Sequence, residues 1–384
     1  MRRAQAIVGV LSFLALAVAP ASAASPSASQ GWLQFRFGPT HTGFNPRERV
    51  LTPQNVSGLV QHWAHPTGAS IFSSPAVAKG LVFITSADQY VYAMDVSTGH
   101  TRWKVKPGGS LQAFCSPAFA DGIVYIATDG QNMHALDAAT GSILWSARTG
   151  SAAASPTIES GVVYLGTDSG DFWALDAATG AVVWKTTGLG LIESSAAVTD
   201  GMVFFGSWDQ TVRGLDAATG QVLWTTPIDG VVAISSPAVS GDVVYVGSND
   251  GNLYAFDEFT GALLWAAPTG DQILSSPAVA GGLVFVGSYD QGLYAFDAAT
   301  GTQVWRSKTL GAVPSSPAVA NGVVYVASED LNLYAFRASN GRLLARLPID
   351  SGPGAGSPQA SSPAVVGGMV FVGSTDAQLY AFGL

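Results

Sequence analysis

The sequence predicts an all-β fold, an eight-bladed β-propeller of four-stranded blades, from three observations. A motif, SSPAV or a close variant, occurs eight times at intervals of about 40 residues, a period typical of propeller blades. Each unit holds short apolar segments rich in Val, Tyr and Phe, as strands do. The two ends of the chain complement each other and together supply the four strands of one blade. The motif begins at Ser73, Cys115, Ala154, Ser194, Ser235, Ser275, Ser315 and Ser361.

Residues 1–23 have the three parts of a cleavable signal peptide. Two arginines give a positive start, residues 6–19 form an apolar run too short to span a bilayer comfortably, and small residues follow at the cleavage site. We therefore expect export, to the periplasm or outside the cell. No cysteine stands at the cleavage site, so no lipid anchor is expected, and no other segment has the length of a membrane anchor. The predicted organisation is a signal peptide (1–23), a lead-in segment (24–57) and the propeller (58–384).

The repeated turn DAATG has a clear physical reading. Its aspartate can accept hydrogen bonds from backbone N–H groups two or three residues on, and its glycine supplies the positive φ that closes a hairpin. A tryptophan follows each such turn at a fixed distance, which indicates a structural anchor between sheets, since a large ring needs a place to be buried. The predicted docking residues are Trp63, Trp103, Trp145, Trp184, Trp224, Trp265 and Trp305.

The ends of the chain predict how the ring closes. WAHPTGASIFSSP (63–75) matches WAAPTGDQILSSP (265–277) at its Trp, Pro-Thr-Gly and Ser-Ser-Pro, so residues 59–67 form a fourth strand with no first three before it. The last unit supplies three strands, ends at Phe382 and has no fourth. We expect these two segments to pair and complete one blade, which removes the exposed edges of an open array.

Two units depart from the pattern. In the seventh, Arg337 replaces the turn aspartate and Ala345 takes the place of the tryptophan, which predicts a blade with weaker docking. The eighth contains an insertion at 350–360, whose Gly, Pro and Ser content predicts a surface loop.

The run ALDAATGAVVW (174–184) resembles the tryptophan-docking repeat of pyrroloquinoline quinone (PQQ) propellers. That family includes quinoprotein alcohol dehydrogenases and the non-enzymatic propeller lipoprotein of the outer-membrane barrel-assembly machinery. The resemblance covers residues 58–384, and WLQFRFGPTHTGFNP (32–46) resembles the lead-in of exported bacterial members. It implies the propeller fold and leaves function open, because the same fold serves enzymes and scaffolds.

The dehydrogenases of that family imply PQQ with calcium on the propeller axis, an aspartate base and a vicinal cysteine disulfide. The single cysteine, Cys115, excludes the disulfide, and the five histidines show no metal-ligand spacing. PQQ carries three carboxylates, which need Arg or Lys partners when buried, yet the loops before each motif hold almost no positive charge. We predict no catalytic residues, no metal site and no bound cofactor, and keep a divergent PQQ-dependent oxidoreductase as the alternative.

One aspartate stands in each of eight turns on one face of the propeller. A ring of carboxylates that binds a cation or a basic peptide is one interpretation. Ordinary turn chemistry is the other, and the sequence favours it because Asp129 and Asp168 sit one residue earlier than the rest, a slip that a shared ligand would not allow. The eight are Asp88, Asp129, Asp168, Asp209, Asp250, Asp290, Asp330 and Asp376.

Residues that break the repeat are the candidates for binding. Glu193 stands where other units have Phe, Ile or Leu, and an unpaired carboxylate there would be costly. Trp208 and Tyr289 place aromatic rings directly before turn aspartates. Arg213 replaces the usual Tyr, and pairing with Glu193 or Asp209 is expected. The predicted binding face comprises Glu193, Trp208, Asp209, Arg213, Tyr289 and Asp290.

The net charge of −9 argues against nucleic acid and anionic lipid as partners. We therefore expect a monomeric, non-catalytic binding or scaffolding module that presents this face to a protein, a peptide or a small ligand. A glycan ligand is a weaker third reading, because only the exposed aromatic residues favour it.

Overall fold

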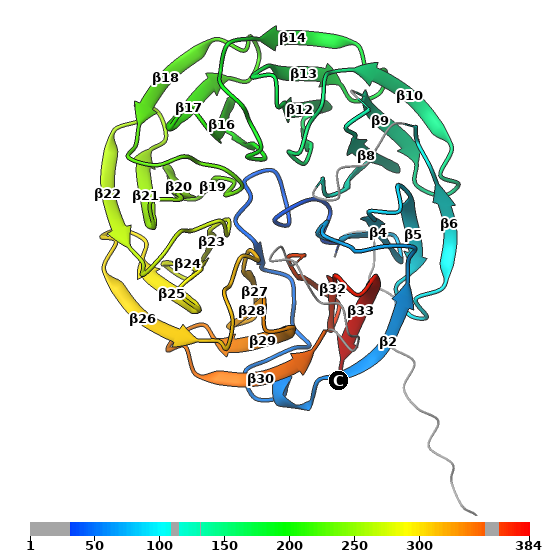
Figure 1. Ribbon diagram of the computed structural model, residues 1–384, viewed down its shortest axis with the longest axis vertical. Coiled ribbons are helices and arrows are strands. Elements are labelled where there is room, and N and C mark those ends of the chain that lie inside the picture. The colour runs from blue at the N-terminus through cyan, green and yellow to red at the C-terminus, as the bar shows by residue number, and fades with distance from the viewer. Residues whose placement is uncertain (1–30, 109–114, 131, 350–360) are drawn as a thin grey trace, which may run out of the picture.

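The computed structural model describes residues 31–108, 115–130, 132–349 and 361–384. The predicted signal peptide and the predicted loop at 350–360 lie outside these residues. The described residues form eight blades around one axis, which confirms the predicted fold (Figure 1). Each blade contains four antiparallel strands, and in the seventh a short parallel strand is added to the inner edge. No helix in these ranges is both long and apolar enough to cross a membrane.

The first four blades consist of β3–β6 (Ala76–Ala78, Leu81–Thr85, Val91–Asp95, Thr101–Val105), β7–β10 (Ala118–Ala120, Ile123–Ala127, Asn132–Asp137, Ile143–Arg148), β11–β14 (Thr157–Glu159, Val162–Gly166, Phe172–Asp176, Val182–Thr186) and β15–β18 (Ala197–Thr199, Met202–Ser207, Thr211–Asp216, Val222–Pro227). The next three consist of β19–β22 (Ala238–Val239, Val243–Gly247, Asn252–Asp257, Leu263–Pro268), β23–β26 (Ala278–Ala280, Leu283–Ser288, Gly292–Asp297, Gln303–Lys308) and β27–β30 (Ala318–Ala320, Val323–Ser328, Asn332–Arg337, Leu343–Pro348). The eighth consists of β31 (Ala364–Val366), β32 (Met369–Gly373), β33 (Gln378–Gly383) and β2 (Val60–Pro66). The lead-in also contains β1 (Phe44–Asn45) and a 3-10 turn, η2 (Val56–Gly58).

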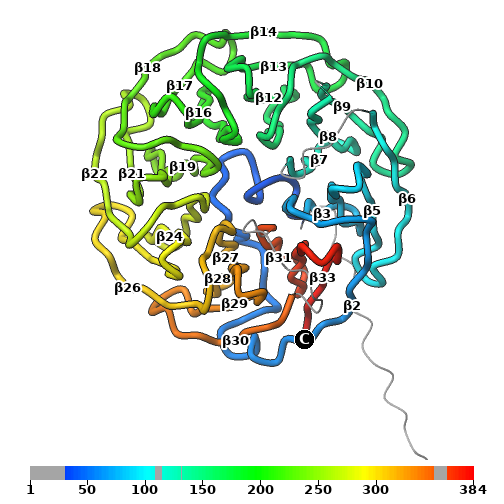
Figure 2. Tube along the Cα trace, in the orientation of Figure 1, coloured from blue at the N-terminus to red at the C-terminus, as the bar shows by residue number. Residues whose placement is uncertain are grey.

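The ring closes as the sequence predicts. β2 pairs antiparallel with β33, and Trp63 lies opposite Ala381. Figure 2 shows the blue N-terminal strand beside the red C-terminal one at this seam. The eighth blade therefore has a full set of four strands, although its outer strand comes from the opposite end of the chain.

The predicted tryptophans dock each blade on the next. Trp184 Nε1 donates to the carbonyl oxygen of Ala217 at 2.9 Å, across the boundary between the third and fourth blades. Its ring covers Gly220, where a Cβ atom would lie only 2.4 Å away, so glycine alone fits. Asp216 fixes the same turn by accepting from the Thr219 N–H at 2.8 Å. The other six tryptophans donate to the following blade in the same way.

The structure explains why the seventh blade has no docking tryptophan. Its neighbour, the eighth blade, has no turn between β33 and β2, because these strands come from opposite ends of the chain. The lead-in covers this place instead: η2 contacts β30, and Leu51 and Val56 are buried in the cluster against which Ala345 packs. A tryptophan at position 345 would have no glycine turn to cover.

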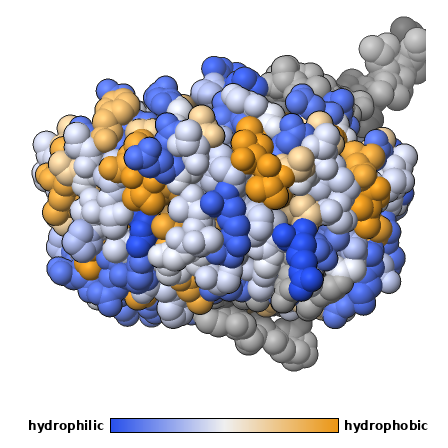
Figure 3. Space-filling model, turned by 90° about the horizontal axis from the view of Figure 1, so that it is seen from above, coloured by the Kyte–Doolittle hydropathy of each residue, from blue (hydrophilic) through white to orange (hydrophobic). Residues whose placement is uncertain are grey.

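The wall of the disc carries small apolar patches. The outer strands expose aliphatic side chains just before the docking tryptophans, and Leu144, Val183, Leu223 and Leu264 are all about half exposed. Figure 3 shows such patches separated by hydrophilic side chains. This view of the wall presents no continuous apolar surface.

Residues 32–45 of the lead-in make a circuit of the axis and contact every blade in turn. Figure 1 shows this segment, here called the inner belt, in blue at the centre of the disc. Carbonyl oxygens of the belt accept from the first strand of six blades at 2.7–2.9 Å; these pairs join Trp32, Leu33, Pro39, Thr40, Thr42 and Gly43 to Val77, Phe119, Val198, Val239, Val279 and Val319. The side chains of Gln34 and Asn45 serve the other two blades, at Ile158 and Val365. The belt thus provides partners for backbone groups that the inner strands would otherwise leave bare.

Candidate functional site

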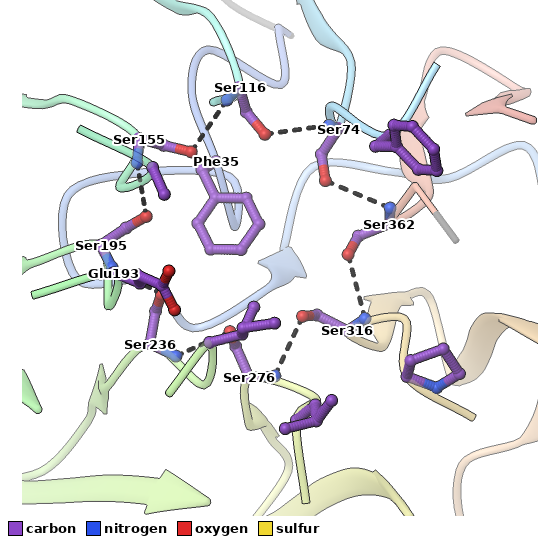
Figure 4. A pocket seen from close by; sticks show the side chains of 15 residues that line it. Phe35, Ser74, Ser116, Ser155, Glu193, Ser195, Ser236, Ser276, Ser316 and Ser362 are labelled. Carbon is purple, nitrogen blue, oxygen red and sulfur yellow. Dashed lines mark hydrogen bonds between the residues drawn. The ribbon is translucent and has the colours of Figure 1, made fainter. Parts of the chain in front are cut away.

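The second serine of the motif forms a closed ring around the axis. The N–H of each serine donates to the hydroxyl oxygen of the serine in the next blade, at 2.8–3.1 Å, and the eighth serine donates back to the first (Figure 4). A hydroxyl that accepts one N–H keeps its own proton and a second lone pair. The ring therefore offers eight small polar groups around the axis; its members are Ser74, Ser116, Ser155, Ser195, Ser236, Ser276, Ser316 and Ser362.

The serine ring surrounds a small cavity, here called the axial funnel, with a free volume of about 80 Å³. Figure 4 shows the ring of Phe35, which belongs to the inner belt, inside the circle of serines. The residues that precede each Ser-Ser pair form the wall, and those that line it are Phe72, Ala153, Glu193, Ile234, Leu274 and Pro314. Glu193 is the only ionisable side chain among the described residues that line the funnel.

The carboxylate of Glu193 points into the funnel (Figure 4), and a hydrogen bond holds it in place. Its Oε2 accepts a hydrogen bond from Trp208 Nε1 at 2.9 Å. Burial raises the pKa of this carboxyl, and the nearby charge of Asp168 acts in the same direction, whereas the bond from Trp208 opposes them. Glu193 is thus partly dehydrated and fixed in orientation.

Arg213 pairs with Asp209, which decides between the two partners expected for it. Its two terminal nitrogens contact both carboxylate oxygens of Asp209, and one of them also donates to the carbonyl oxygen of Leu189 at 2.9 Å. The guanidinium is buried, and its hydrogen bond holds the pKa of Asp209 below the usual range against the effect of burial. Arg213 therefore does not neutralise Glu193.

The other two predicted face residues lie two blades away. Asp290 accepts from the hydroxyl of Tyr294 and forms an ion pair with Arg306 at 2.8 Å. Tyr289 is only partly exposed, and burial together with the charge of Glu329 raises its pKa to about 12. No interaction among the described residues joins this group to Glu193, so the structure brings together Glu193 with Trp208, and Asp209 with Arg213, but not the whole predicted set.

The turn aspartates mostly have structural partners. Five of them accept a hydrogen bond from the tyrosine four residues later; these pairs are Asp88–Tyr92, Asp250–Tyr254, Asp290–Tyr294, Asp330–Tyr334 and Asp376–Tyr380. Asp209 has Arg213 at the same position. Such local pairs favour turn chemistry over a shared ligand. Asp129 differs, because burial and the charge of Asp168 raise its pKa to about 6.

The funnel does not match the needs of PQQ with calcium. Its described lining contains no Lys or Arg for three carboxylates and carries the acid Glu193 instead. The described residues contain no group of three or more His, Cys, Asp or Glu that could hold a metal ion. The free volume of about 80 Å³ is small against the roughly 300–1,000 Å³ of common ligand pockets. The lone Cys115 is buried, and burial raises the pKa of its thiol to about 12.

Sequence reasoning did not identify the serine ring, Phe35 or the inner belt as parts of the site. A signal for the ring exists in the repeat: the first serine of the pair is replaced by Cys115 and Ala154, whereas the second is serine in all eight units. The first position tolerates cysteine because Cys115 Sγ accepts the Ala127 N–H at 3.3 Å, as serine hydroxyls do in other blades. Phe35 occurs once and has no such signal.

Comparison with known families places nearly all of the propeller in one of them. The chain matches the family described as outer membrane protein assembly factor BamB over residues 46–105, 60–120, 106–231 and 208–384. A search of curated proteins found no match.

Solved structures with the same fold include BamB and several dehydrogenases. BamB from Moraxella catarrhalis has 20% identity and a TM-score of 0.71, over 85% of this chain and 98% of that one. A europium-containing methanol dehydrogenase has 15% identity and a TM-score of 0.77, over 92% and 98%. Quinohemoprotein alcohol dehydrogenase from Comamonas testosteroni has 16% identity and a TM-score of 0.79, over 94% and 81%. At these identities the likeness shows the fold alone.

Proposed function

The chain belongs to the family of PQQ-repeat propellers described as outer membrane protein assembly factor BamB, and we propose that it is an exported, non-catalytic propeller that binds a protein or peptide on the face around the axial funnel. The observation that carries this proposal is the funnel lining: on the axis, where the resemblance to PQQ dehydrogenases implies an anionic quinone, the described lining has Glu193 as its one carboxylate, among apolar side chains. An acid there repels a tricarboxylate and favours a cationic partner.

The arrangement of the face supports a binding role. Described residues from all eight blades line one opening, and rigid scaffolds commonly present contact residues in this way. Trp208 is 45% exposed beside Glu193, and an exposed tryptophan next to a fixed acid is a typical anchor for a partner. The inner belt places Phe35 inside the serine ring, and the small free volume there, about 80 Å³, supports a narrow occupant over a large cofactor.

Export is part of the proposal and rests on the signal-peptide pattern of residues 1–23. The family to which the chain belongs is named for assembly at an outer membrane, which suits an exported partner-binding module. The acidic net charge also disfavours nucleic acid as the partner.

Capture and turnover measured on one preparation test the proposal. Protein without residues 1–23 is immobilised and exposed to the exported proteins of the source cells, and its dye-coupled oxidation of alcohols and sugars is assayed with PQQ and calcium. We expect the wild type to retain one partner in stoichiometric amount and Trp208→Ala to lose it. The control Glu159→Gln, at the end of β11 away from the funnel, should retain the partner. We expect no quinone-dependent turnover. Turnover that requires PQQ would refute the non-catalytic role.

A further inference from the structure

The described lining of the axial funnel carries negative charge only, and the nearby positive charge of Arg36 is held by the carbonyl oxygens of Pro277 and Pro317. Glu193 is the only ionisable group in the described lining, Asp168 is close enough to act on it, and Asp168 in turn acts on Asp129. The nearest basic side chain of the same blade, Arg213, is already bound to both oxygens of Asp209. The funnel is therefore a negative, partly dehydrated cavity, in which a cation is stabilised more than at an exposed surface.

The shape of the funnel limits the size of that cation. Its free volume of about 80 Å³ suits the end of one side chain and not a whole cofactor. The upper wall is apolar, with Phe72, Ile234, Leu274 and Pro314 around the opening. An occupant with a methylene stem would cover these side chains, and the face of an aromatic ring such as Phe35 attracts a positive charge.

The floor of the funnel selects for an ammonium group. Each ring serine uses one lone pair for a backbone N–H and can use the other to accept from an ammonium. One oxygen of Glu193 already accepts from Trp208, so this carboxylate is less available to the flat fork of a guanidinium, which needs both oxygens. A compact ammonium needs only the remaining oxygen and scattered single acceptors. We propose that the axial funnel receives the side-chain ammonium of a lysine from the partner, with Glu193 as its counter-ion, an inference that rests on the proposed binding function.

Peptide titration tests this inference. Five pentapeptides, capped at both ends, carry lysine, Nε-acetyllysine, norleucine, arginine or glutamate between pairs of alanines, and each is titrated calorimetrically into protein without residues 1–23. We expect the lysine peptide to bind at least about tenfold more tightly than the acetyllysine and norleucine peptides, because only it forms the charged hydrogen bonds. Binding should weaken as salt rises from about 0.02 to 0.2 M.

Three variants locate the binding. Glu193→Gln keeps the shape of the side chain and should weaken binding of the lysine peptide about tenfold or more. Asp271→Asn is a matched loss of one exposed acid on a loop of the same face. It should change the affinity for the lysine peptide by less than about twofold. Trp208→Phe removes the hydrogen bond to Oε2 of Glu193, so binding of the arginine peptide should strengthen relative to that of the lysine peptide. This third result does not depend on whether Glu193→Gln folds well.

The inference is overturned if norleucine binds as well as lysine, if Glu193→Gln binds like the wild type, or if no peptide binds. Failure of the inference and failure of the proposed function can be told apart, because capture and quinone turnover are measured on the same preparation. Loss of peptide binding with capture intact rejects only the lysine site. PQQ-dependent turnover rejects the binding role, and lysine binding that depends on Glu193 would still support the site.

Discussion

At the scale of the residue, burial decides which polar groups this propeller can hold. Arg36 of the inner belt is almost completely buried, and its guanidinium donates to the carbonyl oxygens of Pro277, at 2.8 Å, and Pro317. Burial lowers its pKa to about 9, so the charge is costly and is kept in place by these two bonds. Gly43 lies directly against the guanidinium, where no side chain fits.

Replacing Gly43 with alanine is expected to destabilise the protein strongly. Its φ is +59° and an added Cβ would lie 2.1 Å from a nitrogen of Arg36, so strain and overlap combine. Gly80 has a similar φ of +78° with nothing within 4 Å, and Gly80→Ala supplies the matched control. In urea denaturation we expect Gly80→Ala to lower the free energy of unfolding by about 1 kcal/mol. Gly43→Ala should lower it by at least about 2 kcal/mol more. Equal losses would mean that Arg36 does not fill the space against Gly43.

Glu258 is expected to make stability depend on pH. The side chain is buried, and burial with the charges of Asp200, Asp242 and Asp257 raises its pKa from 4.5 to about 7. Because the folded-state pKa is the higher one, unfolding releases a proton between these values, and this contribution to stability is lost as pH rises through 7. Glu258→Gln should therefore be more stable than the wild type at pH 8, with the difference vanishing below about pH 4.5. Thermal unfolding at several pH values checks this, and a constant difference would contradict it.

At the scale of the element, each blade depends on contacts made by its neighbours and by the belt. Trp224 Nε1 donates to the carbonyl oxygen of Glu258, and Trp184 Nε1 to that of Ala217. The two acceptors differ, since Ala217 also receives the hydroxyl of Tyr164 at 3.3 Å. Loss of a tryptophan therefore has different consequences at the two boundaries.

Changing each tryptophan to phenylalanine measures that difference. Trp224→Phe leaves the Glu258 carbonyl without a donor among the described residues and should cost about 2 kcal/mol, whereas Trp184→Phe should cost about 1 kcal/mol. Denaturant unfolding of the two variants and of Tyr164→Phe with Trp184→Phe provides the test. The reverse order would show that ring packing, and not the hydrogen bond, dominates docking.

Single side chains of the inner belt are expected to contribute to the stability of the protein. Gln34 both donates to and accepts from the backbone of Ile158 in the third blade. Gln34→Ala leaves a buried N–H and a buried carbonyl bare and should cost about 2–4 kcal/mol. Gln303 is an exposed glutamine of β26, and Gln303→Ala should cost less than about 0.5 kcal/mol. A small effect at Gln34 in guanidinium denaturation would show that the belt adds little to stability.

At the scale of the whole molecule, the repeat determines most of the fold and little of the site. Eight units, the docking tryptophans and the pairing of β2 with β33 follow from recurring residues and could be predicted. The inner belt could not, because its contacts join residues up to 320 positions apart and involve side chains, such as Gln34 and Asn45, that occur in no repeat. Glu193 can be predicted because it breaks the pattern. Trp208 and Tyr289 occupy similar positions in the sequence, but of the two only Trp208 bonds to Glu193 among the described residues.

The serine ring is a property of all eight blades together. Each hydrogen bond links one blade to the next, and the bond from Ser362 to Ser74 closes the circle where the two ends of the chain meet. The small axial funnel, with Glu193 as the one acid of its described lining, results from this closure.

Titration of the protein without residues 1–23 with PQQ, with and without calcium and followed by tryptophan fluorescence, tests this central claim most directly. The acidic, narrow funnel predicts no saturable quenching and no effect of calcium. Saturable, calcium-dependent quenching at one PQQ per protein would contradict the account, because it would show that the axis accepts the anion that Glu193 should repel.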